Sequence, residues 1–141
     1  MPLTAEDFET IGSIEQKYKA EKTAEQNALN DKIMEDVFKA EGGMQKMTEE
    51  VEQIFAAADK NGDSELDCAE FIDYQNKTID AWIGRGMVGA HMTEEDITIM
   101  FNMFNKYNTA TAGIALPDLK AAYGEMMVHH AAKKAAAAGT Q

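Results

Sequence analysis

The stretch that decides the fold is Asp59-Lys60-Asn61-Gly62-Asp63-Ser64-Glu65-Leu66-Asp67-Cys68-Ala69-Glu70. Side chains with oxygen donors stand at positions 1, 3, 5, 9 and 12 of these twelve residues. A turn of this length with these donors can wrap around one hard divalent cation, since Ca²⁺ takes about 6–8 oxygen ligands at about 2.3–2.6 Å. The stretch therefore predicts one metal-binding loop; an acidic surface turn without an ion is the alternative.

The predicted ligand set combines three single side-chain oxygens, one backbone carbonyl, one contact through a water and one bidentate carboxylate. The single side-chain oxygens come from Asp59, Asn61 and Asp63, and the backbone carbonyl from Glu65. Asp67 is the ligand that acts through a water, and Glu70 is the bidentate carboxylate.

Apolar residues recur at helical spacing on both sides of this loop. They are Val51, Ile54 and Phe55 before it, and Phe71, Ile72, Ile79, Trp82 and Ile83 after it. Leu66, at position 8, is the apolar residue expected to fix the loop to a neighbouring strand. Through its twelve loop positions the segment resembles the EF-hand calcium-binding family, and the resemblance implies Ca²⁺ as the bound ion.

One position departs from the family pattern. Position 6 is normally glycine because the chain there needs a positive φ, whereas this sequence has Ser64. A residue other than glycine in that conformation costs about 1 kcal/mol. We expect a weakened site rather than a lost one, with Mg²⁺ as a competing ion.

An internal repeat follows, in which Phe101-x-x-Phe104-Asn105-Lys106 aligns with Phe55-x-x-Ala58-Asp59-Lys60 at a shift of 46 residues. Residues 92–96, Met-Thr-Glu-Glu-Asp, echo residues 47–51, Met-Thr-Glu-Glu-Val. Thr48 is predicted to be the N-cap of the helix that enters the first hand. The repeat predicts a second helix–loop–helix unit.

The second loop is chemically incomplete. It runs from Asn105 to Asp118, two residues longer than the first, with Tyr107 and Thr109 where early ligands should stand. Asp118 is its only carboxylate and is one methylene shorter than the bidentate Glu70. We therefore predict no Ca²⁺ in the second loop.

The resemblance implies an all-α fold in which two EF-hands pack as a pair and share a short two-stranded β ladder through Leu66 and Ile114. We expect an N-terminal helical arm (1–43), a paired EF-hand domain (44–127, with hands at about 48–83 and 93–127), and an Ala/Lys-rich helical extension with a frayed tail (128–141). The expected shared core consists of Ile54, Phe55, Phe71, Phe101, Phe104 and Leu119.

The arm could form one long helix or a helical hairpin. Residues 4–40 contain no proline and are rich in Ala, Glu, Lys and Gln, which favours helix. Thr23-Ala24-Glu25-Gln26 has the form of a capping box, which favours a break near residues 21–23. The two alternatives stay open.

The charge and composition exclude several classes of partner. The net charge of −12 divides into −5 over residues 1–43, −6 over 44–92 and −1 over 93–141. This negative charge disfavours the binding of nucleic acid and anionic lipid, and it attracts divalent cations or a basic partner helix. Cys68 is the only cysteine, which excludes an internal disulfide and fits a reducing compartment. No apolar run reaches membrane-spanning length, so we expect a cytoplasmic protein, with association with the cytoskeleton as an alternative.

The methionines bear on a protein partner. Flexible methionine surfaces are typical of grooves that bind helices, although such side chains also fill irregular cores. Seven of the ten lie in the paired hands or their linker, namely Met47, Met87, Met92, Met100, Met103, Met126 and Met127. We find no nucleophile–base pairing, phosphate loop or zinc spacing, and we expect no enzyme. Three interpretations follow: a Ca²⁺-responsive sensor or adaptor, a structural subunit of a larger assembly, and a Ca²⁺ buffer, which a single site makes the weakest.

Overall fold

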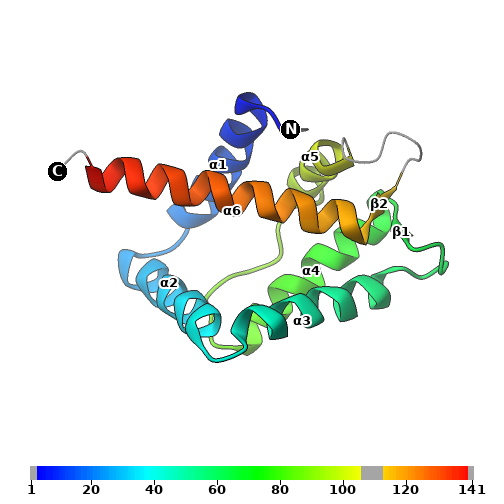
Figure 1. Ribbon diagram of the computed structural model, residues 1–141, viewed down its shortest axis with the longest axis horizontal. Coiled ribbons are helices and arrows are strands. Elements are labelled where there is room, and N and C mark those ends of the chain that lie inside the picture. The colour runs from blue at the N-terminus through cyan, green and yellow to red at the C-terminus, as the bar shows by residue number, and fades with distance from the viewer. Residues whose placement is uncertain (1–2, 106–112, 140–141) are drawn as a thin grey trace.

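The computed structural model describes residues 3–105 and 113–139 and shows a mostly helical chain (Figure 1). Its elements, in order, are α1 (Ala5–Ala20), α2 (Ala24–Lys39), α3 (Gly43–Ala58), β1 (Glu65–Leu66), α4 (Cys68–Gly84), α5 (Glu94–Phe104), β2 (Ile114–Ala115) and α6 (Leu116–Gly139). Helices α3 and α4 pack side by side, and the two short strands join their loop to the start of α6 (Figure 1). The predicted all-α fold with a two-stranded ladder is confirmed.

The ladder pairs the two loops in the expected register. β1 and β2 are antiparallel, with Glu65 opposite Ala115 and Leu66 opposite Ile114. Both Leu66 and Ile114 are fully buried. The preceding residue, Gly113, lies so close to β1 that a Cβ atom there would sit 3.0 Å from Cβ of Glu65 and 3.1 Å from the carbonyl oxygen of Leu66. A glycine therefore allows the two loops to approach each other this closely.

One hydrophobic core joins both hands. The ring of Phe71 from α4 lies 5.8 Å from that of Phe101 and 5.9 Å from that of Phe104, both on α5. Of the six predicted core residues, Phe55, Phe71, Phe101, Phe104 and Leu119 are buried and Ile54 packs against them partly buried. The predicted core is confirmed, and it couples the loop of the first hand to the helices of the second.

A hydrogen-bonded pair of tyrosines, Tyr74 buried and Tyr123 partly buried, was not predicted from the sequence. The hydroxyls of Tyr74 on α4 and Tyr123 on α6 lie 2.8 Å apart and share a hydrogen bond. Burial raises the pKa of both phenols, that of Tyr123 well above its usual value. The pair therefore stays neutral and satisfies two polar groups inside the core.

The N-terminal segment forms two helices rather than one. Thr23 caps α2: its hydroxyl accepts a hydrogen bond from the Gln26 amide at 3.1 Å, and Gln26 Oε1 accepts one from the Thr23 amide at 3.0 Å. This capping box is what the sequence favoured at the break. Leu3 and Ile11 reach the common core, so α1 lies against the paired hands instead of projecting away.

The contact between α1 and α5 is polar. Asp96, in the first turn of α5, accepts hydrogen bonds at its Oδ2 from the Tyr18 hydroxyl at 2.6 Å and from Lys17 Nζ at 2.9 Å. The same Tyr18 oxygen accepts a hydrogen bond from the Thr93 amide at 3.0 Å. The end of α1 thereby satisfies a donor at the N-terminus of α5, where helices have unpaired amides.

The predicted N-cap at Thr48 is wrong. Helix α3 begins five residues earlier, at Gly43, and Thr48 lies inside it with its hydroxyl donating to the Met44 carbonyl at 2.9 Å. The helix starts where α2 and α3 meet: a Cβ on Gly43 would lie 2.2 Å from the Val37 carbonyl oxygen, so only glycine fits this corner. The matching threonine of the repeat, Thr93, does cap α5.

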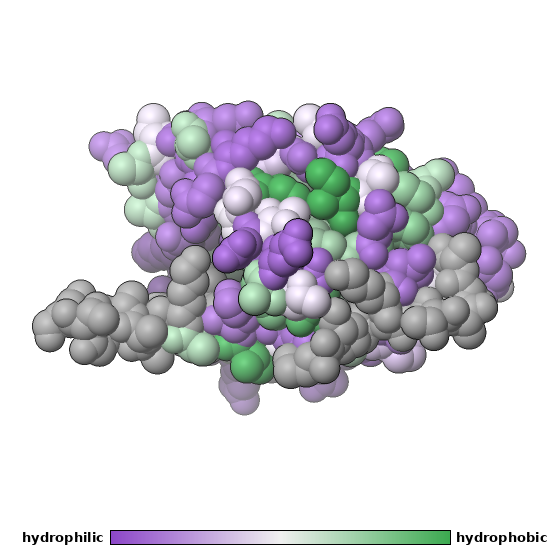
Figure 2. All heavy atoms as spheres, turned by 90° about the horizontal axis from the view of Figure 1, so that it is seen from above, coloured by the Kyte–Doolittle hydropathy of each residue, from purple (hydrophilic) through white to green (hydrophobic). Residues whose placement is uncertain are grey.

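The surface is mainly hydrophilic, with smaller hydrophobic areas between the polar side chains on the face seen in Figure 2. The exposed large apolar side chains of the described residues are Leu29, Met34, Met44, Ile83, Ile99, Met127 and Val128. Of the seven methionines of the hands, Met103 is buried and Met127 is exposed, while Met92, Met100 and Met126 pack partly buried against the core. Within residues 3–105 and 113–139, no helix has the length and apolarity to cross a membrane.

Candidate metal centre

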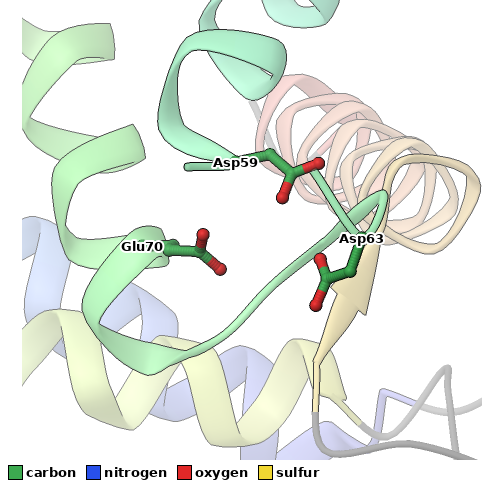
Figure 3. Close-up of side chains that lie close together, drawn as sticks. All are labelled: Asp59, Asp63 and Glu70. Atoms are coloured by element: carbon green, nitrogen blue, oxygen red, sulfur yellow. The ribbon is translucent and has the colours of Figure 1, made fainter. Parts of the chain in front are cut away.

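Three carboxylates converge where the loop joins α3 to α4. Asp59 is the C-cap of α3, Asp63 lies in the middle of the loop, and Glu70 stands in the first turn of α4. Each offers an oxygen, and these oxygens all lie within 4.8 Å of one another. Figure 3 shows the carboxylates of Asp63 and Glu70 facing each other across the loop, with Asp59 beside them. The structure thus brings together three of the six predicted ligands.

The loop is shaped by its own acidic side chains. Asp59 Oδ2 accepts a hydrogen bond from the Ser64 amide at 2.9 Å, and Asp63 Oδ1 accepts one from the Glu65 amide at 3.0 Å. Gly62 has φ +70° and Ser64 has φ +66°, so the chain passes twice through the left-handed region. The positive φ expected at Ser64 is confirmed. It is the only residue other than glycine with positive φ in the described parts of the chain.

Glu70 is positioned by the start of α4. Its amide donates to Asp67 Oδ1 at 2.8 Å, while its own Oε1 accepts from the Asp67 amide at 3.0 Å, which forms a capping box. Its Oε2 accepts from the Lys60 amide at 2.9 Å. A carboxylate has about four lone-pair positions, so both oxygens can still face a cation. Glu70 is also buried, with 7% of its surface exposed, which fixes its orientation.

Asp59 supplies the most informative atom of the site. Its Oδ1 is buried, and no hydrogen-bond donor reaches it among the residues that the structure describes. A buried carboxylate oxygen without a partner is costly, because it has lost water and gained nothing in exchange. Asp59 belongs to the group with Asp63 and Glu70, and a cation bound there could supply the missing partner of this oxygen.

The remaining predicted ligands have other contacts. Asn61 Oδ1 accepts from the Asp63 amide at 3.3 Å, and Asp67 caps α4 as described. Asn61, Asp67 and Glu70 line the same surface hollow, together with Lys60. Glu65 has its backbone in the ladder opposite Ala115. Their roles as amide, water-mediated and carbonyl ligands stay predictions.

The second loop lies mostly outside the described residues, including Tyr107 and Thr109. Its first residue, Asn105, follows α5 and has a buried Oδ1 without a hydrogen bond from any described residue. Asp118 stands in the first turn of α6. The predicted lack of an ion in this loop is therefore untested.

The site combines hard oxygen donors with a concentrated negative charge, which is the chemistry that Ca²⁺ and Mg²⁺ require. The sequence did not reveal the amides of Lys60 and Ser64 as partners of its acids, because such contacts depend on how the loop closes. No protein-family model, curated protein or solved structure matches this chain. The function must therefore be inferred from the geometry of the loop itself.

Proposed function

We propose that the chain is a calcium-binding protein of the EF-hand type that holds one Ca²⁺ in the loop 59–70. The observation that carries the proposal is the convergence of Asp59, Asp63 and Glu70, with oxygens within 4.8 Å of one another. The twelve-residue loop and its strand pairing with a second hand support it.

The size of the cluster agrees with calcium. Two ligands on opposite sides of Ca²⁺ are about 4.6–5.2 Å apart, because each metal–oxygen bond is about 2.3–2.6 Å long. The oxygens of the cluster lie within 4.8 Å of one another, which is compatible with one Ca²⁺ shell. Opposite ligands of Mg²⁺ are only about 4.0–4.2 Å apart, and this ion demands near-ideal octahedral geometry. We expect Mg²⁺ to compete but to bind more weakly.

Calorimetric titration tests this proposal. We expect one Ca²⁺ per chain, and we expect Glu70→Gln to weaken binding by more than about 100-fold, since even outer-shell partners of metal ligands are worth about 10- to 100-fold. Glu65→Gln is the matched control: it removes the same charge from the same loop but keeps the backbone carbonyl. Equal losses in the two variants, or no binding by the native chain at millimolar Ca²⁺, would refute the proposal. Two bound ions would refute the prediction for the second loop.

We also propose that the protein acts by binding a protein partner of basic character. Leu29 and Met34 on α2, Met44 on α3 and Ile83 on α4 are exposed, and their elements meet at one corner of the molecule (Figure 1). The arm that contributes to this corner carries a net charge of −5 over residues 1–43. A basic amphipathic segment would complement both the apolar side chains and this charge.

The sensor and structural interpretations differ in their response to the ion. Trp82 is a natural reporter, because its ring lies 6.4 Å from that of Phe38 on α2 and beneath the guanidinium of Arg85. A change in Trp82 fluorescence on Ca²⁺ addition supports a sensor, and an unchanged signal with one bound ion supports a structural subunit. The proposal includes no catalytic role, because the sequence contains no catalytic motif. A cytoplasmic location likewise stays a prediction.

A further inference from the structure

Helix α1 lies against the two helices of the second hand. Near its start, the ring of Phe8 is stacked on that of His129 of α6, with the ring centres 4.1 Å apart. At its end, Tyr18 and Lys17 donate hydrogen bonds to Asp96 of α5 at 2.6 and 2.9 Å. Helix α1 crosses α6 in Figure 1. It therefore bridges α5 and α6 through contacts near both of its ends.

The face of α1 that makes these contacts is that of an amphipathic helix. Phe8, Ile11 and Ile14 are spaced three residues apart and Tyr18 follows four residues later, so the four side chains share one face. Ile11 and Ile14 are buried, and Phe8 packs partly buried against the core. The opposite face is exposed and polar, with Glu9, Ser13 and Gln16. This is how a helix seated on a binding surface is patterned.

The core of the paired hands closes without help from α1. Among the described residues, every hydrophobic side chain without exposed surface belongs to the hands, for example Phe71, Tyr74 and Phe104. The side chains that the arm contributes are less enclosed: Leu3 is 5% exposed, Ile11 6% and Ile14 8%. Helix α1 therefore covers the edge of a core that the two hands build between themselves.

Helix α2 is attached to the hands independently of α1. Asn30 Nδ2 donates to the Val88 carbonyl at 2.9 Å, and Asn30 Oδ1 accepts from the Val88 amide at 2.8 Å. The ring of Phe38 also lies 6.4 Å from that of Trp82. Only residues 21–23 join α1 to this anchored helix. If α1 leaves α5 and α6, it therefore stays tethered beside them, at an effective concentration of about 1 mM.

The surface under α1 also selects for charge. The first turn of α5 carries Glu94, Glu95 and Asp96, and Asp96 is only 7% exposed. The last turn of α1 is basic, with Lys17 and Lys19. Cations are favourable at the C-terminal end of a helix, and here one of them also pairs with the buried carboxylate. A helix that fits this surface therefore needs an apolar face and a basic C-terminal end.

We propose that α5 and α6 form a docking surface for an amphipathic helix of a partner protein, with apolar residues three apart and a basic C-terminal end, and that α1 occupies this surface until the partner displaces it. The inference goes beyond the proposed metal site, because it requires no ion. The surface also differs from the corner formed by α2, α3 and α4. Because α1 competes from within the chain, a partner binds more weakly than the surface alone would allow.

A dye-labelled peptide of residues 3–20 stands in for the partner helix, and its fluorescence anisotropy measures binding. The double variant Phe8→Glu/Ile11→Glu detaches α1, and we expect it to bind the peptide at about 10 μM. The native chain should bind about 100-fold more weakly, the ratio of about 1 mM to about 10 μM. Ser13→Glu/Gln16→Glu is the matched control: it adds the same two charges to exposed positions of α1. It should bind the peptide as weakly as the native chain.

A second double variant keeps every apolar side chain of α1, so it decides the question even where the first fails to fold. Lys17→Ala/Tyr18→Phe removes both donors to Asp96 and should bind the peptide about tenfold more tightly than the native chain does, because hydrogen bonds to a charged group are worth about that factor. Asp96→Asn, added to Phe8→Glu/Ile11→Glu, should weaken peptide binding by about the same factor.

Equal peptide affinity in the native chain and in Lys17→Ala/Tyr18→Phe would overturn the proposal. A native dimer that Phe8→Glu/Ile11→Glu abolishes in analytical ultracentrifugation would also overturn it, because α1 would then serve a second copy of the chain. The expected order of affinities is the same with and without Ca²⁺. Loss of the docking surface and loss of the metal site are therefore distinguishable: peptide binding reports the first and calcium calorimetry the second.

Discussion

Replacing Ser64 by glycine should stabilise the protein, because Ser64 is held at φ +66°. A side chain in the left-handed region costs about 1–2 kcal/mol. Glycine removes this strain but loses about 0.5–1 kcal/mol through the greater freedom of the unfolded chain. The two terms differ by about 0–1.5 kcal/mol, and we take about 0.5–1 kcal/mol as the central expectation for the net gain in the free energy of unfolding.

Thermal and urea unfolding measure this gain. For a chain of 141 residues, 1 kcal/mol corresponds to about 2–4 °C in Tm, so we expect Ser64→Gly to raise Tm by about 1–4 °C. Because the strained residue lies between the proposed ligands Asp63 and Glu65, we also expect tighter Ca²⁺ binding, by up to about fivefold for 1 kcal/mol.

Two glycines provide the reverse experiment. Gly62 and Gly42 have φ +70° and +71°, and a Cβ atom at either position would meet nothing within 4 Å. Alanine there costs conformational strain without a steric clash, so Gly62→Ala and Gly42→Ala should each lose about 0.5–1 kcal/mol. Only Gly62→Ala, inside the loop, should also lower the affinity for the metal. A stability loss in Ser64→Gly, or no loss in either alanine variant, would refute the reasoning.

Two further predictions concern acid stability and the ladder. The Tyr18 hydroxyl and then the Lys17 ammonium donate to Asp96 and hold its pKa below the usual range. A carboxyl whose pKa is lower in the folded state stabilises the fold above its unfolded pKa, and this stability is lost as the pH falls through the folded pKa. In Asp96→Asn the free energy of unfolding should therefore depend less on pH in the acidic range. An acidic pH dependence equal to that of the native chain would contradict this. Leu66→Ala should cost about 2–5 kcal/mol in urea unfolding, because this side chain is fully buried. Ile99→Ala, at a position 37% exposed, should stay within about 0.5 kcal/mol, and similar losses in both would argue against the ladder as a packing element.

The loop, the ladder and most of the core could be predicted because their signals are local. The spacing of oxygen side chains identified Asp59, Asp63 and Glu70, and the apolar residue at position 8 marked Leu66 for a strand contact, whereas its pairing with Ile114 was implied by the resemblance to the EF-hand family. Apolar residues at helical spacing mark the buried face of each helix wherever that face lies.

Features decided by distant contacts could not be predicted. Helix α3 begins at Gly43 because the carbonyls of α2 leave room for no Cβ there, and Thr48 gives no hint of this. The bond between Tyr74 and Tyr123 joins residues 49 positions apart. The pairing of Arg85 with Glu50 likewise requires the angle between α3 and α4, which sequence periodicity does not contain.

The two hydrogen bonds between Asn30 and residue 88 have an evolutionary consequence, since they involve only the main chain of that residue. Any amino acid except proline offers the same N–H and C=O groups there. Position 88 can therefore drift in sequence without loosening the arm, whereas position 30 needs a carboxamide of the right length. One side chain of α2 must therefore be preserved to keep this junction, whereas the side chain at position 88 is free to vary.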